Sequence, residues 1–397
     1  MTRRSPQFAS RFVALAALLL VLAPALASAQ VVVKLNNTVN FRFGMQVQAW
    51  ADWTQDPNSR GYSQNFFIRR VRFIVLATVA PRVTIFYETD HPRVGSAGNT
   101  GIKNVSTGFL TQDAFLEWRF AGDFAAIQAG LFLVPSSRNF LTSTASFTAV
   151  DFGTWESQGN TLLQGNGGRD YGIGANGYLA GNRLSYRVGI FDGARRGTTA
   201  QTAPLGAAAG SRNSFRFAGR VNYDFFDTEK GYTYVGSNNG ARKVVAIGGW
   251  YDTQMSYLAY GADGIFDWPI AKNAVKAEVD YKHYNSGTSK GFGTPATPTA
   301  PATYAVPPQN DVYVDAGFFI AAAKLQPFFK YESLSFVEAA DRSMNQQRVG
   351  GGLNFYVYGN NMKISAIWEK IIPKTKPTTA AIKDTNHFAI QFHAMYF

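Results

Sequence analysis

The chain ends in HFAIQFHAMYF, residues 387–397, and this stretch gives the clearest indication of the fold. Apolar side chains, most of them large, occupy every second position of it: Phe388, Ile390, Phe392, Ala394 and Tyr396. The positions between them are His387, Ala389, Gln391 and His393. A period of two is that of a β-strand, and a strand end with an aromatic face would fray or aggregate in water. The stretch therefore predicts a strand whose apolar face meets lipid and which is paired on both sides.

The same alternation recurs along most of the chain. It is clearest in VNFRFGMQVQAWADW (39–53), RLSYRVGIF (183–191), FRFAGRVNYDF (215–225) and VKAEVDYK (275–282). We count about sixteen such segments of about ten residues, the length that a tilted strand needs to cross a bilayer. Short turns such as 79–82 and 358–361 alternate with long polar stretches such as 91–108 and 135–168. Short turns at one rim and long loops at the other are typical of an outer-membrane barrel.

The physics of the bilayer requires such a sheet to close. Hydrocarbon offers no hydrogen-bond partner to the backbone, so only helices or closed sheets span it. Beyond residue 29, no apolar run approaches the ~20 residues that a membrane helix needs. The sequence therefore predicts an all-β, transmembrane antiparallel β-barrel of about 16 strands, with apolar side chains outside and polar side chains in the bore. The alternative, a soluble β-sandwich or propeller, leaves the alternating loop lengths unexplained, and no blade-length repeat is found.

The first residues have the pattern of an export signal. Residues 1–29 combine a basic start, an apolar centre and a small-residue cleavage site, which predicts a cleaved signal peptide followed by a barrel over 30–397. The net charge of +12 then falls to about +9, because the signal carries three arginines and no acidic residue. This excess favours anionic partners, but an exported chain without a basic stripe is not expected to bind nucleic acid. There are no cysteines, which excludes disulfides and thiolate chemistry.

The order of the segments resembles the phosphate-selective porin O and P family along most of the mature chain. The resemblance rests on FFIRRVRFIVLATV, DAFLEWRF, IQAGLFLVPSS, RDYGIGANGYL, YRVGIFDG, FRFAGRVNYDFFD, YGADGIF, KLQPFFKYE and GGLNFYVYGNNMKI. It implies a sixteen-stranded barrel, a homotrimer, and a long third external loop that folds inward, here 135–168. The chain departs from the family at Leu133, where a Lys is usual, and at Ser136, where a Phe is usual. Loop 135–168 also contains no Lys, which puts phosphate selectivity in question.

Parity along the strands gives the candidate pore-lining residues. The basic residues expected to face the bore and contact anions are Arg70, Arg72, Arg187, Arg216, Arg220, Lys330 and Arg348, together with Arg138 on loop 135–168. Arg138 is the strongest candidate, and Arg42 is expected near the rim of short turns. The acidic residues on the same parity are Glu88, Asp113, Glu117, Asp224, Asp263, Glu278, Asp280, Asp315 and Glu332. Basic and acidic walls nearly balance, so pairing across strands is the alternative to solute contact for each arginine.

These features predict a porin in the bacterial outer membrane. Small and preferentially anionic solutes, with phosphate as a candidate, would diffuse passively through a water-filled channel surrounded by outer-membrane lipid. We expect no enzyme activity, no cofactor and no metal site, because the four histidines are scattered and no nucleophile elbow is present. Two alternatives stay open: a barrel that acts as a surface scaffold or adhesin, and an outer-membrane hydrolase. The Pro-rich loop 291–308 has no assigned role.

Overall fold

The computed structural model describes residues 31–96, 103, 108–156, 167–193, 214–285, 293–294, 303–304, 307–374 and 383–397. The expected signal peptide and most of the Pro-rich loop 291–308 lie outside these residues. Within that loop, β13 (Gly293–Thr294) and β14 (Thr303–Tyr304) form a short antiparallel pair.

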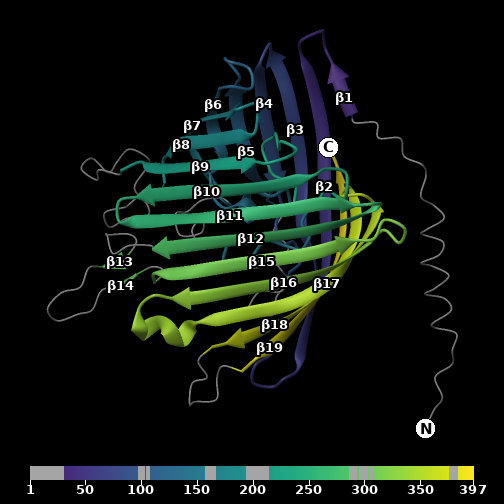
Figure 1. The fold of residues 1–397 in the computed structure, drawn as a ribbon, viewed down its shortest axis with the longest axis vertical. Coiled ribbons are helices and arrows are strands. Elements are labelled where there is room, and N and C mark those ends of the chain that lie inside the picture. Colours follow the sequence, from purple (N-terminus) through teal and green to yellow (C-terminus); the bar gives the residue numbers. More distant parts are fainter. Residues whose placement is uncertain are drawn as a thin grey trace.

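Sixteen of the described strands close into one antiparallel barrel, as the sequence predicts (Figure 1). Each strand pairs with the next, and β19 pairs with β2 to complete the ring. In chain order the barrel strands are β2 (Asn40–Gln55), β3 (Tyr62–Ala80), β4 (Val83–Asp90), β5 (Leu110–Trp118), β6 (Ala126–Leu133), β7 (Arg169–Leu179), β8 (Leu184–Phe191), β9 (Arg216–Asp224), β10 (Val244–Gln254), β11 (Tyr257–Ile270), β12 (Asn273–Asn285), β15 (Gln309–Phe319), β16 (Leu325–Phe336), β17 (Gln346–Tyr358), β18 (Met362–Pro373) and β19 (Thr385–Tyr396). The terminal stretch 387–397 therefore lies on the closing strand, as predicted.

The seam between the two ends of the barrel involves one additional strand. β19 covers β2 from Thr54 to Met45, and β1 (Val31–Lys34) covers the remaining part of β2, from Phe43 to Asn40. β1 thus continues the line of the last strand, and the edge of β2 stays paired along its length.

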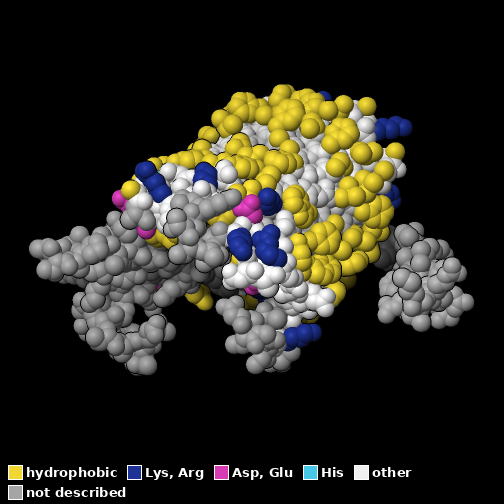
Figure 2. All heavy atoms as spheres, turned by 90° about the horizontal axis from the view of Figure 1, so that it is seen from below, with side chains coloured by type: hydrophobic (Ala, Val, Ile, Leu, Met, Phe, Trp, Pro, Cys, Tyr) yellow, Lys and Arg dark blue, Asp and Glu magenta, His cyan; other side chains and the backbone are white. Residues whose placement is uncertain are grey.

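The two faces of the wall differ as the period of two predicts. On β9, Phe217 and Val221 are 50% and 54% exposed, whereas the alternating Arg216 and Arg220 are 1% and 2% exposed. Hydrophobic side chains cover much of the outer wall in Figure 2. Apolar outside and charged inside is the arrangement of a transmembrane β-barrel.

The connections define two ends, which we call the long-loop rim and the short-turn rim. The long-loop rim carries 56–61, 91–109, 134–168, 192–215 and 286–308. Most connections at the short-turn rim are a few residues long, for example between β3 and β4 or between β11 and β12. The connection 225–243, between β9 and β10, is the long one at this rim.

Two segments enter the bore, one from each rim. The third long loop folds inward over residues 134–156 and carries the single turn of helix α2 (Arg138–Leu141), which confirms the inward-folded loop predicted from the resemblance. The connection 225–243 enters from the opposite rim and pairs with it: Ser143 N–H donates to the Tyr234 carbonyl at 2.9 Å, and Tyr234 N–H donates to the Leu141 carbonyl at 3.0 Å. The alternation of apolar and polar residues does not predict this second segment. The remaining described helix is the 3₁₀ turn η1 (Ala339–Met344) at the long-loop rim.

Among the described residues, no helix is long and apolar enough to cross a membrane.

Candidate functional site: the barrel lumen

The loop 134–156 is fixed to one wall of the bore by a pair of arginines on β3. Arg69 is the extra residue of a β-bulge, and consequently both Arg69 and the next residue, Arg70, reach into the bore. Both bind one carboxylate, Asp151 near the end of the loop, with contacts of 2.8 and 2.6 Å. Two guanidinium groups therefore share one negative charge at this point.

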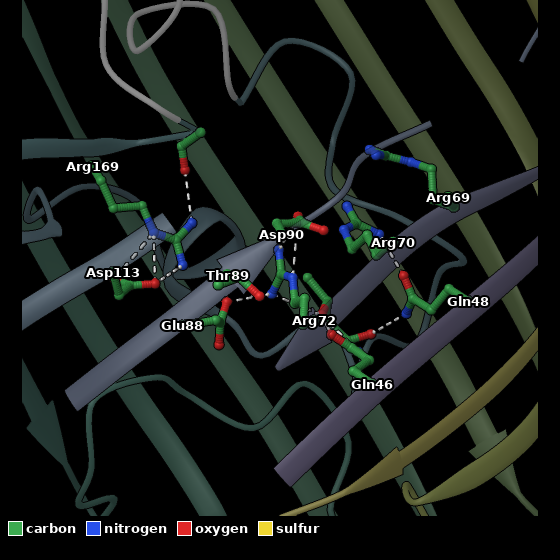
Figure 3. A network of polar contacts seen from close by, with 12 residues as sticks. Gln46, Gln48, Arg69, Arg70, Arg72, Glu88, Thr89, Asp90, Asp113 and Arg169 are labelled. Carbon is green, nitrogen blue, oxygen red and sulfur yellow. Dashed lines mark hydrogen bonds and ion pairs between the residues drawn. The ribbon is translucent and has the colours of Figure 1, made fainter. Parts of the chain in front are cut away.

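The next inward residue of β3 lies in a fuller network, drawn in Figure 3. Arg72 binds Glu88 and Asp90 of the neighbouring β4, each at 3.1 Å. Further round the same wall, Arg169 of β7 binds Asp113 of β5 at 2.9 Å (Figure 3). These pairs join adjacent or nearby strands, and their charges neutralise one another inside the bore.

Arg138, the strongest sequence candidate, is fully buried with an exposed fraction of 0%. Its guanidinium binds Glu229 of the segment 225–243 at 2.8 Å, and its backbone N–H donates to Asp263 of β11 at 3.0 Å. The following N–H, of Asn139, donates to Asp280 of β12 at 3.1 Å. The first turn of α2 is thus held against the wall by two carboxylates, which satisfy its otherwise unpaired donors.

Two of the predicted arginines on β9 are also paired with wall carboxylates. Arg216 binds Asp252 of β10 at 2.8 Å and Asp170 of β7 at 3.2 Å. Arg220 binds Asp263 of β11 through two N–H groups, one of them at 2.7 Å. Bidentate pairs of this kind hold the strands in register and leave little of either arginine for a solute.

The basic residues on the last strands differ in their surroundings. Lys330 lies between Glu332 and Glu369, at 2.5 and 2.8 Å. Arg348 is half-buried, and no carboxylate of the described residues lies within ion-pair distance of it. Its guanidinium carbon lies 5.8 Å from the ring centre of Trp155 on the inward loop. Arg348 is therefore a guanidinium beside the loop whose charge is not directly neutralised.

Arg187 of β8 is the second such residue. It donates to the carbonyls of Tyr232 and Gly231, at 2.7 and 2.9 Å, and none of the described carboxylates forms an ion pair with it. It also lies 5.1 Å from the ring centre of Tyr234. Arg138 and Arg220 lie around the same ring, at 4.6 and 5.1 Å. This ring is thus in cation–π contact with three arginines.

The opposite wall, on β11, β12 and β15, is acidic. Its inward carboxylates are Asp263, Asp267, Glu278, Asp280, Asp311 and Asp315, and the lysines on this wall are Lys276 and Lys282. One oxygen each of Glu278 and Asp280 is buried without a hydrogen-bond partner among the described residues. Charged side chains of both signs therefore lie on this wall, as they do on the wall drawn in Figure 3.

The polar lining is interrupted by aromatic side chains between β4 and β9. Phe86, Phe115, Phe132 and Phe191 lie on the inward parity of their strands and pack together with Tyr232 of the segment 225–243. The ring centres of Phe115 and Tyr232 are 4.9 Å apart. The bore is therefore not lined by polar groups alone, which differs from the prediction that polar side chains line it.

The pKa values of Asp151 and Glu156, the two acidic residues of the inward loop, are shifted in opposite directions. Burial disfavours the charged form of Asp151, but the charges of Arg69 and Arg70 outweigh it and hold its pKa below the ordinary range. Burial raises the pKa of Glu156, since Lys282 and the hydroxyl of Ser137 offset the loss of hydration only in part. Within the described part of the chain, no group of histidines and carboxylates is arranged to hold a metal ion.

Comparison with known proteins supports the fold. No family model matches the chain, and no curated protein matches its sequence. Solved structures match its fold. OmpF of Salmonella typhi, in a complex with daunomycin, aligns with a TM-score of 0.59 and 11% identity over 92% of this chain and 100% of that one. The chain has the fold of bacterial porins.

Two further solved structures agree with this result. The anion-selective porin from Comamonas acidovorans aligns with a TM-score of 0.51 and 10% identity over 90% of this chain and 100% of that one. The trimer form of OmpT, an outer membrane protein of Vibrio cholerae, aligns with a TM-score of 0.51 and 11% identity over 91% and 100%. At such low identity the likeness extends to the fold.

Proposed function

We propose that the chain forms a channel in the bacterial outer membrane through which small, preferentially anionic solutes diffuse passively. The observation that carries this proposal is the difference between the two faces of the wall. Apolar side chains are exposed on the outer face, and charged side chains lie on the inner face of a closed ring. A bore lined with charges between low-dielectric walls concentrates ions of the opposite sign and lets them pass without turnover. We expect neither a cofactor nor catalysis.

The anion preference is supported by the basic residues that are not fully neutralised. Arg187 and Arg348 have no carboxylate partner among the described residues, and Arg69 and Arg70 share Asp151. Guanidinium is always charged, is weakly hydrated and binds carboxylate or phosphate through two N–H groups. Of the eight basic residues predicted from the sequence, we therefore assign Arg70, Arg187 and Arg348 to the ion path and the other five to structural pairing.

The finer assignments stay part of the proposal. The resemblance to the phosphate-selective porin O and P family supports phosphate as a candidate solute and a homotrimer as the assembly, and the export pattern of residues 1–29 supports the location. The absence of Lys from loop 135–168 argues for a general preference for anions over a specific one for phosphate.

A second function, a closed barrel that serves as a surface scaffold, is favoured by one observation. The two inward segments bury many lumen side chains almost completely, among them Arg138, Lys363 and Tyr356. Purified protein in a planar lipid bilayer decides between the two functions. A channel gives unitary currents whose reversal potential in a salt gradient has the anion-selective sign, whereas a scaffold gives no current.

A further inference from the structure

A cavity of about 340 Å³ lies inside the barrel near the short-turn rim, between β3 and β8. Its lining comes mainly from these strands, and its inner boundary is formed by Leu133 at the end of β6, Pro135 of the inward loop, and Gly231 and Tyr232 of the segment 225–243. A volume of this size falls within the ~300–1,000 Å³ of small-molecule pockets. The cavity is therefore large enough for a small organic solute.

Several aromatic side chains contribute to the lining of the cavity. Phe86, Phe115, Tyr178 and Tyr232 contribute to it, and the C-terminal Phe397 borders it. The rings are already arranged as a cluster, with ring centres 5.5 Å apart for Phe86 and Tyr232 and 5.4 Å apart for Phe86 and Phe115. An apolar ring placed among them would bury its surface and make edge or offset contacts. A strongly hydrated ion would instead lose its water against these rings.

The lining of the cavity contains three charged side chains, Glu117, Arg119 and Arg187. Glu117 is satisfied inside the lining: Arg119 binds it at 2.7 Å, and the amides of Gln128 and Asn176 each donate to it at 3.3 Å. Arg187 is the other charged residue of the lining, and no described carboxylate neutralises it. Counting side chains alone, the lining thus holds two guanidinium groups and one carboxylate, and Arg119 also lies 3.7 Å from Asp123.

The guanidinium of Arg187 is also held in place, and its contacts with the described residues do not use all of its N–H groups. It has five N–H groups, of which the bonds to the carbonyls of Gly231 and Tyr232 use two. Those bonds and the Tyr234 ring orient the group. The remaining N–H groups can receive a carboxylate, for which the planar guanidinium is suited.

We propose that this cavity binds aromatic monocarboxylates, with the carboxylate on Arg187 and the ring among Phe86, Phe115 and Tyr232. The inference rests on the proposed channel function only for the route by which the ligand arrives. It adds a solute class to that function: amphipathic organic anions are held at this site, while small inorganic anions are not.

Isothermal titration calorimetry of the full chain in detergent tests this site with benzoate, acetate and inorganic phosphate as probes. We expect benzoate to bind at least about tenfold more tightly than acetate or phosphate, because only benzoate fills the aromatic part. Arg187→Gln should weaken benzoate binding by at least about tenfold. Arg82→Gln is the matched control: the same charge is removed at the same rim from a residue outside the lining, and benzoate affinity should stay unchanged.

A second variant guards against loss of the fold, since Arg187 also holds the segment 225–243. Phe86→Leu keeps Arg187 and should weaken benzoate binding while leaving the weak binding of acetate unchanged. Benzoate binding no tighter than that of phosphate, or unaffected by both Arg187→Gln and Phe86→Leu, would overturn the site. Anion-selective conductance without benzoate binding overturns this inference alone, whereas benzoate binding without conductance overturns the channel and leaves the site standing.

Discussion

At the scale of single residues, Asp151 is the most informative contact between the inward loop and the wall. It binds Arg69 and Arg70, and its side chain is 20% exposed. Asp151→Asn would leave two neighbouring guanidinium groups without their counter-charge. We expect the free energy of unfolding to fall by about 2 kcal/mol, a typical value for a charged hydrogen bond, as measured by urea titration of the folded barrel at pH 7.

The ion pairs of Asp151 with Arg69 and Arg70 also predict how the free energy of unfolding changes with pH. A carboxyl group whose folded-state pKa is lowered stabilises the fold above its unfolded pKa and loses this contribution as the pH falls towards the folded pKa. The pKa of Asp151 is lowered. The stability difference between the wild type and Asp151→Asn should therefore be constant above about pH 4, the ordinary range of an aspartate, and shrink below it. Asp341→Asn, on η1 at the rim, is the control, and a difference that already vanishes near pH 6 would contradict the ion pair.

Substitutions of Arg348 and Arg138 distinguish a residue that lies on the ion path from a residue that stabilises the fold. Arg348→Gln removes a charge that no described carboxylate neutralises, and the ratio of anion to cation permeability should fall by at least about twofold. Arg138→Gln leaves Glu229 buried without its partner, so it should cost about 3–5 kcal/mol of stability and change the permeability ratio less. Reversal potentials measure the first effect and urea titration the second. A larger change of selectivity from Arg138→Gln would favour the role predicted from the sequence.

Parity predicted which side chains face inward, but not which of them are neutralised. The period of two placed Arg220 and Lys330 inside, together with Asp263 and Glu332, which prove to be partners of theirs. It also placed Arg216 inside, but its partners Asp252 and Asp170 were not among the acidic residues predicted there. The partners of Arg70 and Arg138, Asp151 and Glu229, belong to aperiodic segments, and their positions depend on how those segments fold. The bulge that turns Arg69 inward likewise has no signature in the alternation.

At the scale of elements, the segment 225–243 is expected to limit the conductance. It enters the bore from the short-turn rim and pairs with the inward loop through Tyr234. Asp227 N–H donates to the Lys243 carbonyl, so an Asn-Gly turn can join these two residues in place of 228–242. We expect this replacement to raise the unitary conductance severalfold, because it removes protein from the cross-section of the bore.

A matched shortening tests whether the position of the segment matters. Residues 338–344, which include η1, lie at the long-loop rim with mostly exposed side chains. Their replacement by the same turn should leave the conductance unchanged. Equal conductance of both variants and the wild type would mean that ions do not pass beside the segment 225–243.

The two inward segments differ in how far sequence could predict them. The inward course of loop 135–168 followed from the family resemblance and from its length between the fifth and sixth barrel strands. Nothing in the composition of GYTYVGS, residues 231–237, separates an inward segment from a loop that projects into water. Its three-dimensional role depends on Tyr232 and Tyr234 meeting the inward loop and arginines of distant strands.

At the scale of the whole molecule, a lipid-facing wall means that the free-energy cost of placing an arginine on it depends on the depth of that position in the bilayer. Val221, in the middle of β9, is 54% exposed, and Phe215, next to the end of that strand at the long-loop rim, is 61% exposed. Arginine at the bilayer midplane of a barrel costs about 2–4 kcal/mol, and about 0–1 kcal/mol near the interface. Val221→Arg should therefore destabilise folding into phospholipid vesicles far more than Phe215→Arg. Equal and small costs would place this face in water.

The architecture was predictable because one physical constraint acts on every strand. Hydrocarbon forces the sheet to close and forces each strand to alternate, so the sixteen strands and the closing role of 385–396 could be deduced from local patterns. The interior is under no such constraint. The aromatic cluster around Phe115 and the second inward segment satisfy packing and charge locally, and these are contacts between residues far apart in the chain.

The most direct test of the central claim is single-channel recording of the purified chain in a planar lipid bilayer under a potassium chloride gradient. We predict discrete unitary currents with a reversal potential of the anion-selective sign. The absence of any current, or a reversal potential of the cation-selective sign, would contradict the account.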